Sequence, residues 1–416
     1  MQRRFFMLVI IMIAANYQNL TFGQNNFKSA ILILNNGDSL AGEIDYRNWK
    51  QSPAKITFRK DAVSQSETYS PTEVSSFRVS DEIYYGATAL VDKCSDIDGE
   101  LHLSRDIITA SRAIFLTTAI SGNKSLYYYD DGIVHFYIRK NENFELLRYK
   151  KYIRRGDSKE FIETNNDYMA QLSAYLSDCL SINSKIEKTT YDLPSLNKVF
   201  LAYYACSASS TAYSLPKQKT ALEFGLLAGI SNSTLRMVNE PASEGKFKGS
   251  TNFSGGLFFD IILPRNLKKI SINNELSYTS YSAESYTEQI TNQNSYVTTS
   301  RKLAFAYIKM NNMARYRFLL KNANLFLNTG LTTGLAISNT NQKEIFTKSY
   351  SSEQTKRSAV ISSPRTYEQG YLLGIGGKMK RLSIEARMEK SNGMSPSVRL
   401  KTAVTRYFAL LGYQIK

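Results

Sequence analysis

Most of residues 217–416 alternate between apolar and polar side chains with a period of two residues. The alternation is clearest at 382–389, where Leu382, Ile384, Ala386 and Met388 oppose Ser383, Glu385, Arg387 and Glu389. Side chains of a β-strand point alternately to its two faces, so this period predicts strands and excludes helices. Eight such segments can be counted, around residues 222–227, 256–261, 270–278, 308–318, 325–336, 371–376, 382–389 and 406–415.

Strands of this kind build either a soluble sheet or a membrane barrel. No run of 18 apolar residues follows residue 24, so the mature chain is either soluble or crosses a membrane with strands. In a soluble sandwich or lipocalin-like barrel the apolar face points inward, whereas in a membrane barrel it faces lipid. Charged residues gather on one face beside glycines, which favours a polar lumen. Residues 217–416 are therefore predicted to form an eight-stranded antiparallel transmembrane β-barrel.

The predicted lumen carries charges of both signs. Eight strands leave room only for side chains inside a barrel, so these charges are expected to neutralise one another and to leave no open pore. The predicted lumen charge network consists of Glu223, Glu275, Lys309, Arg315, Arg317, Glu385, Arg387 and Glu389, and Asp260 falls on the same face.

The connections between the predicted strands alternate in length, as they do in outer-membrane barrels. Short turns are expected at 264–266, 321–322 and 378–381, and long loops at 231–250, 282–301 and 338–369, with a shorter one at 391–397. Both barrel ends then lie on the short-turn side, which places the N-terminal domain in the periplasm. The short turns are basic and are expected to bind lipid head groups or the slightly acidic periplasmic domain, with solvated charge as the alternative; the residues are Arg265, Lys268, Lys269, Lys378, Lys380 and Arg381.

Residues 1–23 have the pattern of a secretory signal peptide. Arg3 and Arg4 precede an apolar run over 5–15, and Thr21 and Gly23 are small residues that suit cleavage after residue 23. The alternative is an uncleaved anchor, although 11 apolar residues are well short of the roughly 20 that a spanning helix needs. We therefore expect an exported protein.

The net charge of +16 belongs to one half of the chain. Residues 24–216 have 22 Lys and Arg against 24 Asp and Glu, whereas residues 217–416 have 28 against 12. The shift supports a domain boundary near 215–216. A basic half suggests nucleic acid in an intracellular protein, but export makes anionic lipid, lipopolysaccharide or a polyanionic glycan the expected partner.

Residues 24–216 are predicted to form a periplasmic α+β domain. Asn36 and Gly37 suit a tight hairpin turn between strands at 30–34 and 39–46, and a β-meander continues through 156. The meander could close into a small barrel or a sandwich. Residues 157–216 are expected to hold a helical hairpin and a linker, with Cys179 and Cys206 ending the apolar faces of the two helices. A disulfide between them is predicted, leaving Cys94 over; three free thiols or a Cys94 pairing are alternatives.

Few residues suited to catalysis or metal binding are present. The chain has 2 His and 3 Cys, and the barrel half has no His at all. The acidic residues Asp92, Asp96, Asp98 and Glu100 do not match a calcium-binding loop and are read as a solvated turn. His102 and His135 are assigned to ordinary packing. No cofactor, metal or catalytic site is predicted.

Residues 219–416, on the strand pattern above, resemble the outer-membrane β-barrel domains of Gram-negative bacteria, of the PorT-like and OmpA-like kind. The resemblance implies insertion by the barrel-assembly machinery, which commonly reads a terminal aromatic residue, whereas this chain ends in Lys416. The segment 37–46 resembles N-terminal domains found before such barrels.

Three functions follow as hypotheses. The first is a non-enzymatic envelope anchor, organiser or secretion accessory, with outer-membrane lipid, lipopolysaccharide and a periplasmic protein or peptidoglycan as partners, and no nucleic acid. A small channel or transporter and surface recognition through the long loops are the alternatives.

Overall fold

The computed structural model describes residues 25–93, 103–155, 159–238, 247–320, 322–397 and 400–415. The protein is mainly β, with 63% strand and 9% helix, which confirms the predicted fold class at this level. The chain divides into two compact units, residues 1–217 and 218–416, which are described separately. The predicted signal peptide at 1–23, Cys94 and His102 lie outside the described residues.

The first unit is built on one antiparallel sheet with the order β10-β9-β8-β7-β6-β5-β1-β2-β3-β4, and a short β13 pairs with β7. Its strands are β1 Phe27–Leu34, β2 Ser39–Asp45, β3 Ile56–Arg59, β4 Glu67–Tyr69, β5 Val74–Val79, β6 Glu82–Asp92, β7 Thr109–Ser121, β8 Leu126–Asp130, β9 Val134–Lys140, β10 Asn143–Leu146 and β13 Tyr213–Ser214. Strands β11 Lys150–Arg155 and β12 Glu160–Asn165 form a separate two-stranded ribbon. No pairing between β10 and β4 joins the two ends of the sheet within the described residues, so the meander stays open.

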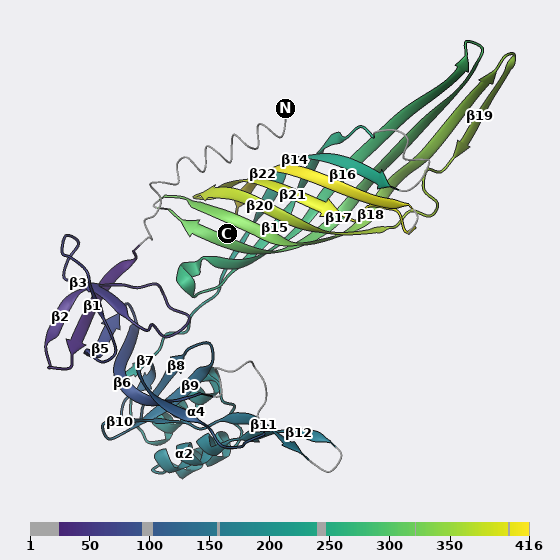
Figure 1. Ribbon diagram of the computed structural model, residues 1–416. Coiled ribbons are helices and arrows are strands. Elements are labelled where there is room, and N and C mark those ends of the chain that lie inside the picture. The colour runs from purple at the N-terminus through teal and green to yellow at the C-terminus, as the bar shows by residue number, and fades with distance from the viewer. Residues whose placement is uncertain are drawn as a thin grey trace. The chain divides into compact units, whose positions relative to one another are not determined.

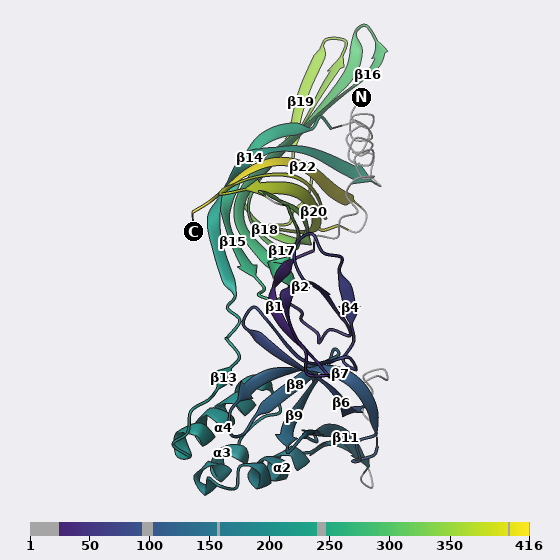
Figure 2. The ribbon, with the colours of Figure 1, turned by 90° about the vertical axis from the view of Figure 1, so that its left-hand side faces the viewer.

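Helices cover part of this sheet (Figure 2). They are α2 Asp167–Tyr175, the 3-10 turn η3 Leu180–Ile182, α3 Asn183–Ile186 and α4 Leu193–Cys206. The apolar positions of α2 and α4 pack on side chains of β7, β8 and β9 in one buried cluster that includes Leu172, Phe200 and Phe136. Helix α4 begins at Leu193, and Pro194 lies in its first turn. The N-cap residue is Asp192, whose carboxylate accepts a hydrogen bond from the Ser195 amide at 2.9 Å.

A disulfide joins Cys179 and Cys206, whose Cα atoms lie 6.3 Å apart. The first helix, however, ends at Tyr175 rather than continuing to Cys179. Asp178 lies in the turn that follows, where it accepts a 2.5 Å hydrogen bond from the Tyr203 hydroxyl of α4. The disulfide therefore ties this turn to the end of α4.

Two strands of the first unit differ from the expected pattern. Strand β12 lies inside 157–216, which was predicted as helices and linker, because Phe161 and Ile162 pair with Arg154 and Ile153 of β11. Strand β6 lies within the predicted meander and is one of the longest strands in the sheet, although its sequence is a weak strand signal. It has small and polar residues such as Gly86 and Thr88 in place of a regular alternation.

The second unit is a ring of antiparallel strands (Figure 1). Sheet order β17-β16-β15-β14-β22-β21-β20-β18 is closed by pairing of β17 with β18, and β19 lies outside the ring on β18. The strands are β14 Ala221–Val238, β15 Ser250–Ile262, β16 Ile270–Asn292, β17 Ser295–Leu319, β18 Asn324–Ser349, β19 Ser352–Ser358, β20 Tyr367–Met379, β21 Leu382–Ser391 and β22 Lys401–Gln414; a 3-10 turn, η5 Asn266–Lys268, connects β15 and β16.

The two faces of this ring are chemically opposite. Apolar side chains point outward, as in Leu331, Ile384 and Leu411, which are 63–67% exposed. Charged side chains point inward, and Arg406 and Glu389 are at most 1% exposed. This orientation suits a barrel in lipid and is the reverse of that in a soluble lipocalin-like barrel.

Two of the predicted long loops are largely strand instead. Strands β16 and β17 pair continuously from Ile270 and Tyr316 to Asn292 and Ser295, so 282–301 is a hairpin. Strand β18 likewise continues to Ser349 before turning into β19. These segments are rich in Ser, Thr and Tyr, and continued pairing satisfies their backbone groups beyond the ring. Figure 1 shows the resulting hairpins projecting from one end of the barrel. Strand β14 similarly extends to Val238, beyond the predicted loop start at 231.

Within the described residues, no helix is both long and apolar enough to span a membrane.

Candidate functional site in the barrel interior

The interior polar groups come from inward positions of consecutive ring strands. Inward residues of β17 include Lys309, Arg315 and Arg317, and those of β21 include Glu385, Arg387 and Glu389. Small inward residues make room for them: a Cβ atom on Gly374 of β20 would lie 2.3 Å from Glu385 Oε1. The alternation of the strands therefore places the charged side chains inside the ring, and the glycines leave space for them to contact one another.

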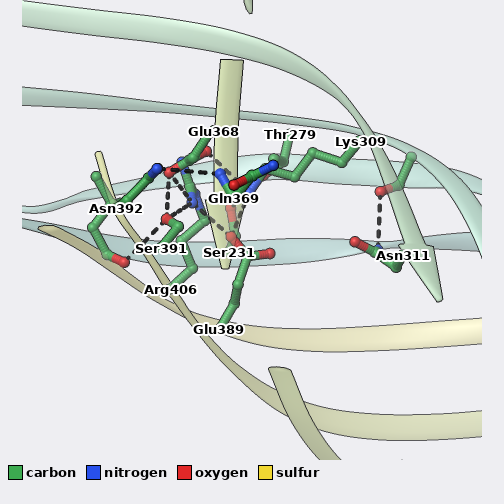
Figure 3. A network of polar contacts seen from close by, with 12 residues as sticks. Ser231, Thr279, Lys309, Asn311, Glu368, Gln369, Glu389, Ser391, Asn392 and Arg406 are labelled. Atoms are coloured by element: carbon green, nitrogen blue, oxygen red, sulfur yellow. Dashed lines mark hydrogen bonds and ion pairs between the residues drawn. The ribbon is translucent and has the colours of Figure 1, made fainter. Parts of the chain in front are cut away.

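The Arg406 network is drawn in Figure 3 and consists of Lys309 of β17, Glu368 of β20, Glu389 and Ser391 of β21, and Arg406 of β22. Arg406 donates from Nη1 to Glu389 at 2.7 Å and to Glu368 at 3.0 Å, and from Nη2 to the other oxygen of Glu368 at 3.0 Å. Lys309 forms ion pairs with the same two carboxylates. Ser391 donates its hydroxyl to Glu368. Two cations thus share two anions in a fully buried site.

The Arg387 network, composed of Glu275, Asn311, Glu385 and Arg387, adjoins the Arg406 network through neighbouring positions of β17 and β21. Arg387 binds Glu275 through two hydrogen bonds of 2.6 and 2.7 Å and donates from Nε to Glu385 at 2.8 Å. Asn311 donates to Glu275 at 3.1 Å. The two-pronged guanidinium contact is the strongest geometry available to a buried Arg and a carboxylate.

A third group surrounds Asp260 of β15. Arg315 donates to Asp260 at 3.0 Å, and Arg317 binds the same oxygen. Arg315 also donates from Nε to Asn328 at 2.8 Å, and its Nη2 lies 3.9 Å from Glu385. Arg315 therefore links this group to the Arg387 network.

Glu223 and Lys378 form a separate pair. Lys378 Nζ lies 2.6 Å from Glu223, so Glu223 does not pair with Lys309, Arg315 or Arg317 within the described residues. Assignment of Lys378 to a lipid head-group turn is wrong, because it lies inside β20 and its ammonium is partly buried against this carboxylate. Of the other predicted turn residues, Lys268, Lys380 and Arg381 are exposed and Arg265 and Lys269 are half-buried.

Charge in the three connected groups is balanced. Five acids, Asp260, Glu275, Glu368, Glu385 and Glu389, meet five bases, Lys309, Arg315, Arg317, Arg387 and Arg406. Removing charges from water is expensive, and close pairing of opposite charges offsets that cost. The rings of Tyr281 and Tyr307 add to this, with centroids 5.0 and 5.6 Å from the Arg406 guanidinium.

The interior is tightly filled around these networks. A cavity between them, lined in part by Glu275, Lys309 and Arg387, has a volume of about 10 Å³, the space of roughly one water molecule. Toward the projecting hairpins the lining becomes an apolar cluster, the hairpin-end cluster: Leu235, Met237, Tyr281, Ala283, Leu303, Phe305, Tyr307, Ile361, Met394, Leu400 and Val404. The polar-lumen prediction did not include this apolar cluster.

Glu368 is the charged network member that the alternation pattern did not assign to the interior. Asp260 and Arg406 fall on predicted polar faces, but Glu368 lies in 338–369, which was predicted as a loop. The two-residue period of β20 could have indicated its position, because Glu368 falls on the same inward face as Gly370 and Gly374. In the first unit, His135 is buried, stacks on Tyr129 and lies 3.5 Å from Asp131. The described residues contain no group of three or more His, Cys, Asp and Glu placed to hold a metal ion.

Comparison with known proteins agrees with this architecture. Residues 209–391 match the family model described as outer membrane protein beta-barrel domain. The match confirms the prediction of an outer-membrane β-barrel in the C-terminal half and supports an outer-membrane location. None of the curated proteins compared with the chain matches it.

Solved structures similar to this chain include three outer-membrane proteins. Neisserial surface protein A is 12% identical with a TM-score of 0.25 and covers 46% of this chain and 98% of its own. Ail of Yersinia pestis, in complex with sucrose octasulfate, is 12% identical with a TM-score of 0.23, covering 47% and 99%. OprG of Pseudomonas aeruginosa is 11% identical with a TM-score of 0.21, covering 47% and 94%.

Proposed function

We propose that this protein is a non-enzymatic outer-membrane anchor whose barrel is closed to solutes and holds residues 25–217 in the periplasm. The observation that carries the proposal is the interior itself. Ten paired charges and the hairpin-end cluster occupy the space through which a solute would pass. Because these charged side chains pair with one another, the interior has the character of a core and favours anchoring over transport.

The connections of the ring support the periplasmic placement. The links β15–β16, β17–β18 and β20–β21 are short, and the hairpins at the other end project far beyond the ring. Outer-membrane barrels keep their short turns on the periplasmic side. The chain enters β14 and leaves β22 at that same end, so the preceding unit would be periplasmic, which is compatible with the predicted signal peptide.

An anchor of this form fits an envelope organiser or a secretion accessory of the PorT-like kind. The first unit would present its sheet and helices to a periplasmic protein or to peptidoglycan. The barrel would contact outer-membrane lipid and lipopolysaccharide after insertion by the barrel-assembly machinery. Exposed Lys268, Lys380 and Arg381 lie at short turns, where they can meet lipid head groups.

Surface recognition is the second candidate. Its supporting observation is the projecting sheet of β16, β17, β18 and β19, which continues past the ring and carries exposed Tyr286, Ile290 and Tyr350. An anchor without an external role has no need of so long an ordered extension.

Location and topology can be tested together by fractionation, heat-modifiable gel mobility and protease treatment of intact cells. We expect recovery in the outer membrane, cleavage in the projecting hairpins and protection of residues 25–217 until the outer membrane is permeabilised. Recovery as a soluble periplasmic protein, or cleavage of the first unit in intact cells, would contradict the proposal.

A further inference from the structure

One buried arginine lies outside the paired networks. Arg301 of β17 is 5% exposed and lies on the inward face, beyond the hairpin-end cluster. In the described part of the chain, neither its Nε nor its Nη1 has a hydrogen-bond acceptor. All five buried bases of the interior networks bind at least one carboxylate, whereas Arg301 forms no ion pair with a carboxylate of the described residues.

The register of three strands places two further polar groups beside Arg301. Arg301 pairs with Ser285 of β16 on one side and with Lys343 of β18 on the other. Residues paired across antiparallel strands point to the same face, so the three side chains form one row, the Arg301 row. The Ser285 hydroxyl is also buried and has no partner among the described residues.

The nearby carboxylates point away from this row. Glu284 and Glu344 adjoin Ser285 and Lys343 in sequence and therefore lie on the opposite face. There they pair with Lys302 at 3.1 Å and with Arg357 at 2.8 Å. The described residues thus supply the Arg301 row with two cations and a hydroxyl but with no ion-pairing carboxylate.

The next row toward the ring is held in place by Asn341. Its side chain donates to the carbonyl of Ile361 at 2.7 Å and accepts from the amides of Val360 and Ile361 at 2.9 and 3.0 Å. Ile361 is consequently buried in the hairpin-end cluster. The residues next to the Arg301 row, on the side of the ring, are therefore held in place by side-chain hydrogen bonds and are not a frayed strand end.

We propose that the Arg301 row binds a tetrahedral oxyanion, a phosphate or sulfate group. A buried guanidinium without an acceptor is costly, and an oxyanion with several acceptor oxygens relieves that cost. Planar guanidinium groups bind phosphate in two-pronged fashion, an ammonium adds charge and a hydroxyl adds a third donor. The group is carried either by a free inorganic ion or by lipopolysaccharide.

The test uses the full chain folded in detergent, titrated calorimetrically with inorganic phosphate and sulfate at constant ionic strength. We expect saturable binding of at least one ion, weakened about tenfold or more by Arg301→Gln. Lys302→Gln is the matched control, because Lys302 is the next residue and points to the opposite face; its affinity should stay within about twofold of wild type. Heat-modifiable mobility checks that each variant is folded.

A second variant keeps the proposal testable if Arg301→Gln does not fold. Lys343→Gln alters a half-buried member of the row and should weaken binding several-fold. A parallel titration with lipopolysaccharide, intact or stripped of phosphate, identifies the carrier: Arg301-dependent binding of only the intact form assigns the site to a lipid-borne phosphate. The proposal is overturned if neither ion nor intact lipopolysaccharide binds, or if binding is unchanged in both row variants.

Discussion

Arg387 shows how a charge is accommodated inside this barrel. The residue is 5% exposed, yet its guanidinium meets Glu275 in two hydrogen bonds and Glu385 in a third. Removing one member of a buried pair leaves an uncompensated charge, which costs more than the pair itself contributes. Replacing one member of a buried ion pair should therefore destabilise the barrel more than replacing both members together.

Arg387→Met is expected to lower the free energy of unfolding by about 3–5 kcal/mol, because Glu275 and Glu385 would lose their shared cation. Urea titration in lipid vesicles, followed by heat-modifiable mobility, measures the change. Adding Glu275→Gln should recover part of the loss. Arg357→Gln, which breaks an exposed pair with Glu344, is the control and should cost less than about 1 kcal/mol. Equal losses for Arg387→Met and the control would refute the account.

Two glycines of β20 test the packing around the same network. A methyl group at Gly374 would meet Glu385 Oε1 at 2.3 Å, whereas at Gly377 its nearest neighbour lies at 3.6 Å. Gly374→Ala should destabilise the barrel by about 1–3 kcal/mol through overpacking, because Glu385 is held by Arg387 and cannot move aside freely. Gly377→Ala should be nearly neutral in the same urea titration. The reverse order of stability would show that the network is loosely packed.

At the scale of elements, the ring strands follow directly from alternation. Segments such as 382–389 have one apolar and one charged face, and β21 spans Leu382–Ser391. The projecting hairpin was predicted as loop because 282–301 is dominated by Ser, Thr, Tyr and Asn, which occur in both surface loops and solvated strands. Beyond the membrane neither face needs to be apolar, so the periodic signal disappears while the pairing continues.

The sequence predicted most of the charged residues that face the interior, but not which partner each of them binds. Alternation assigns residues to the inward face, whereas the partner of each depends on strand register and stagger around the ring. Glu223, for example, meets Lys378 across the closed barrel, at a sequence separation of 155. Such contacts become visible only when the ring is closed.

The disulfide is an element-scale constraint on the first unit. Cys179 and Cys206 are 27 residues apart, and closing a loop of this length stabilises a fold by about 2–4 kcal/mol. The double Cys→Ser variant should unfold at a lower urea concentration. Fluorescence of Trp49, the single Trp of the chain, reports this because Trp49 packs in the first unit. Barrel heat-modifiability should not change. A variant as stable as the wild type would show that the crosslink is dispensable.

The projecting hairpin should be separable from the ring. Replacing residues 288–298 by Asn-Gly joins Thr287 to Thr299, which already pair in register, through a turn suited to a hairpin. We expect normal membrane insertion and heat-modifiable mobility, since ring strands pair over Ile270–Tyr281 and Phe305–Tyr316 without this segment. Failure to insert would show that the extension is required for barrel assembly.

The whole molecule combines an apolar outer surface, packed interior networks whose charges balance and a separate folded unit before the first barrel strand. The excess of basic over acidic residues in 217–416 is therefore not located in the interior networks, where five acids and five bases balance. It lies on other parts of this half, the Arg301 row among them, and the proposed contact with anionic lipid would draw on its exposed residues. This division of charge fits an anchor.

The most direct test of a closed anchor is single-channel conductance of the full-length protein in planar bilayers bathed in concentrated KCl. Insertion is verified beforehand by heat-modifiable mobility in vesicles of the same lipid. We expect a silent bilayer, because the paired interior and the hairpin-end cluster leave no path for hydrated ions. Reproducible discrete conductance steps from correctly folded wild-type protein would contradict the account and favour a channel.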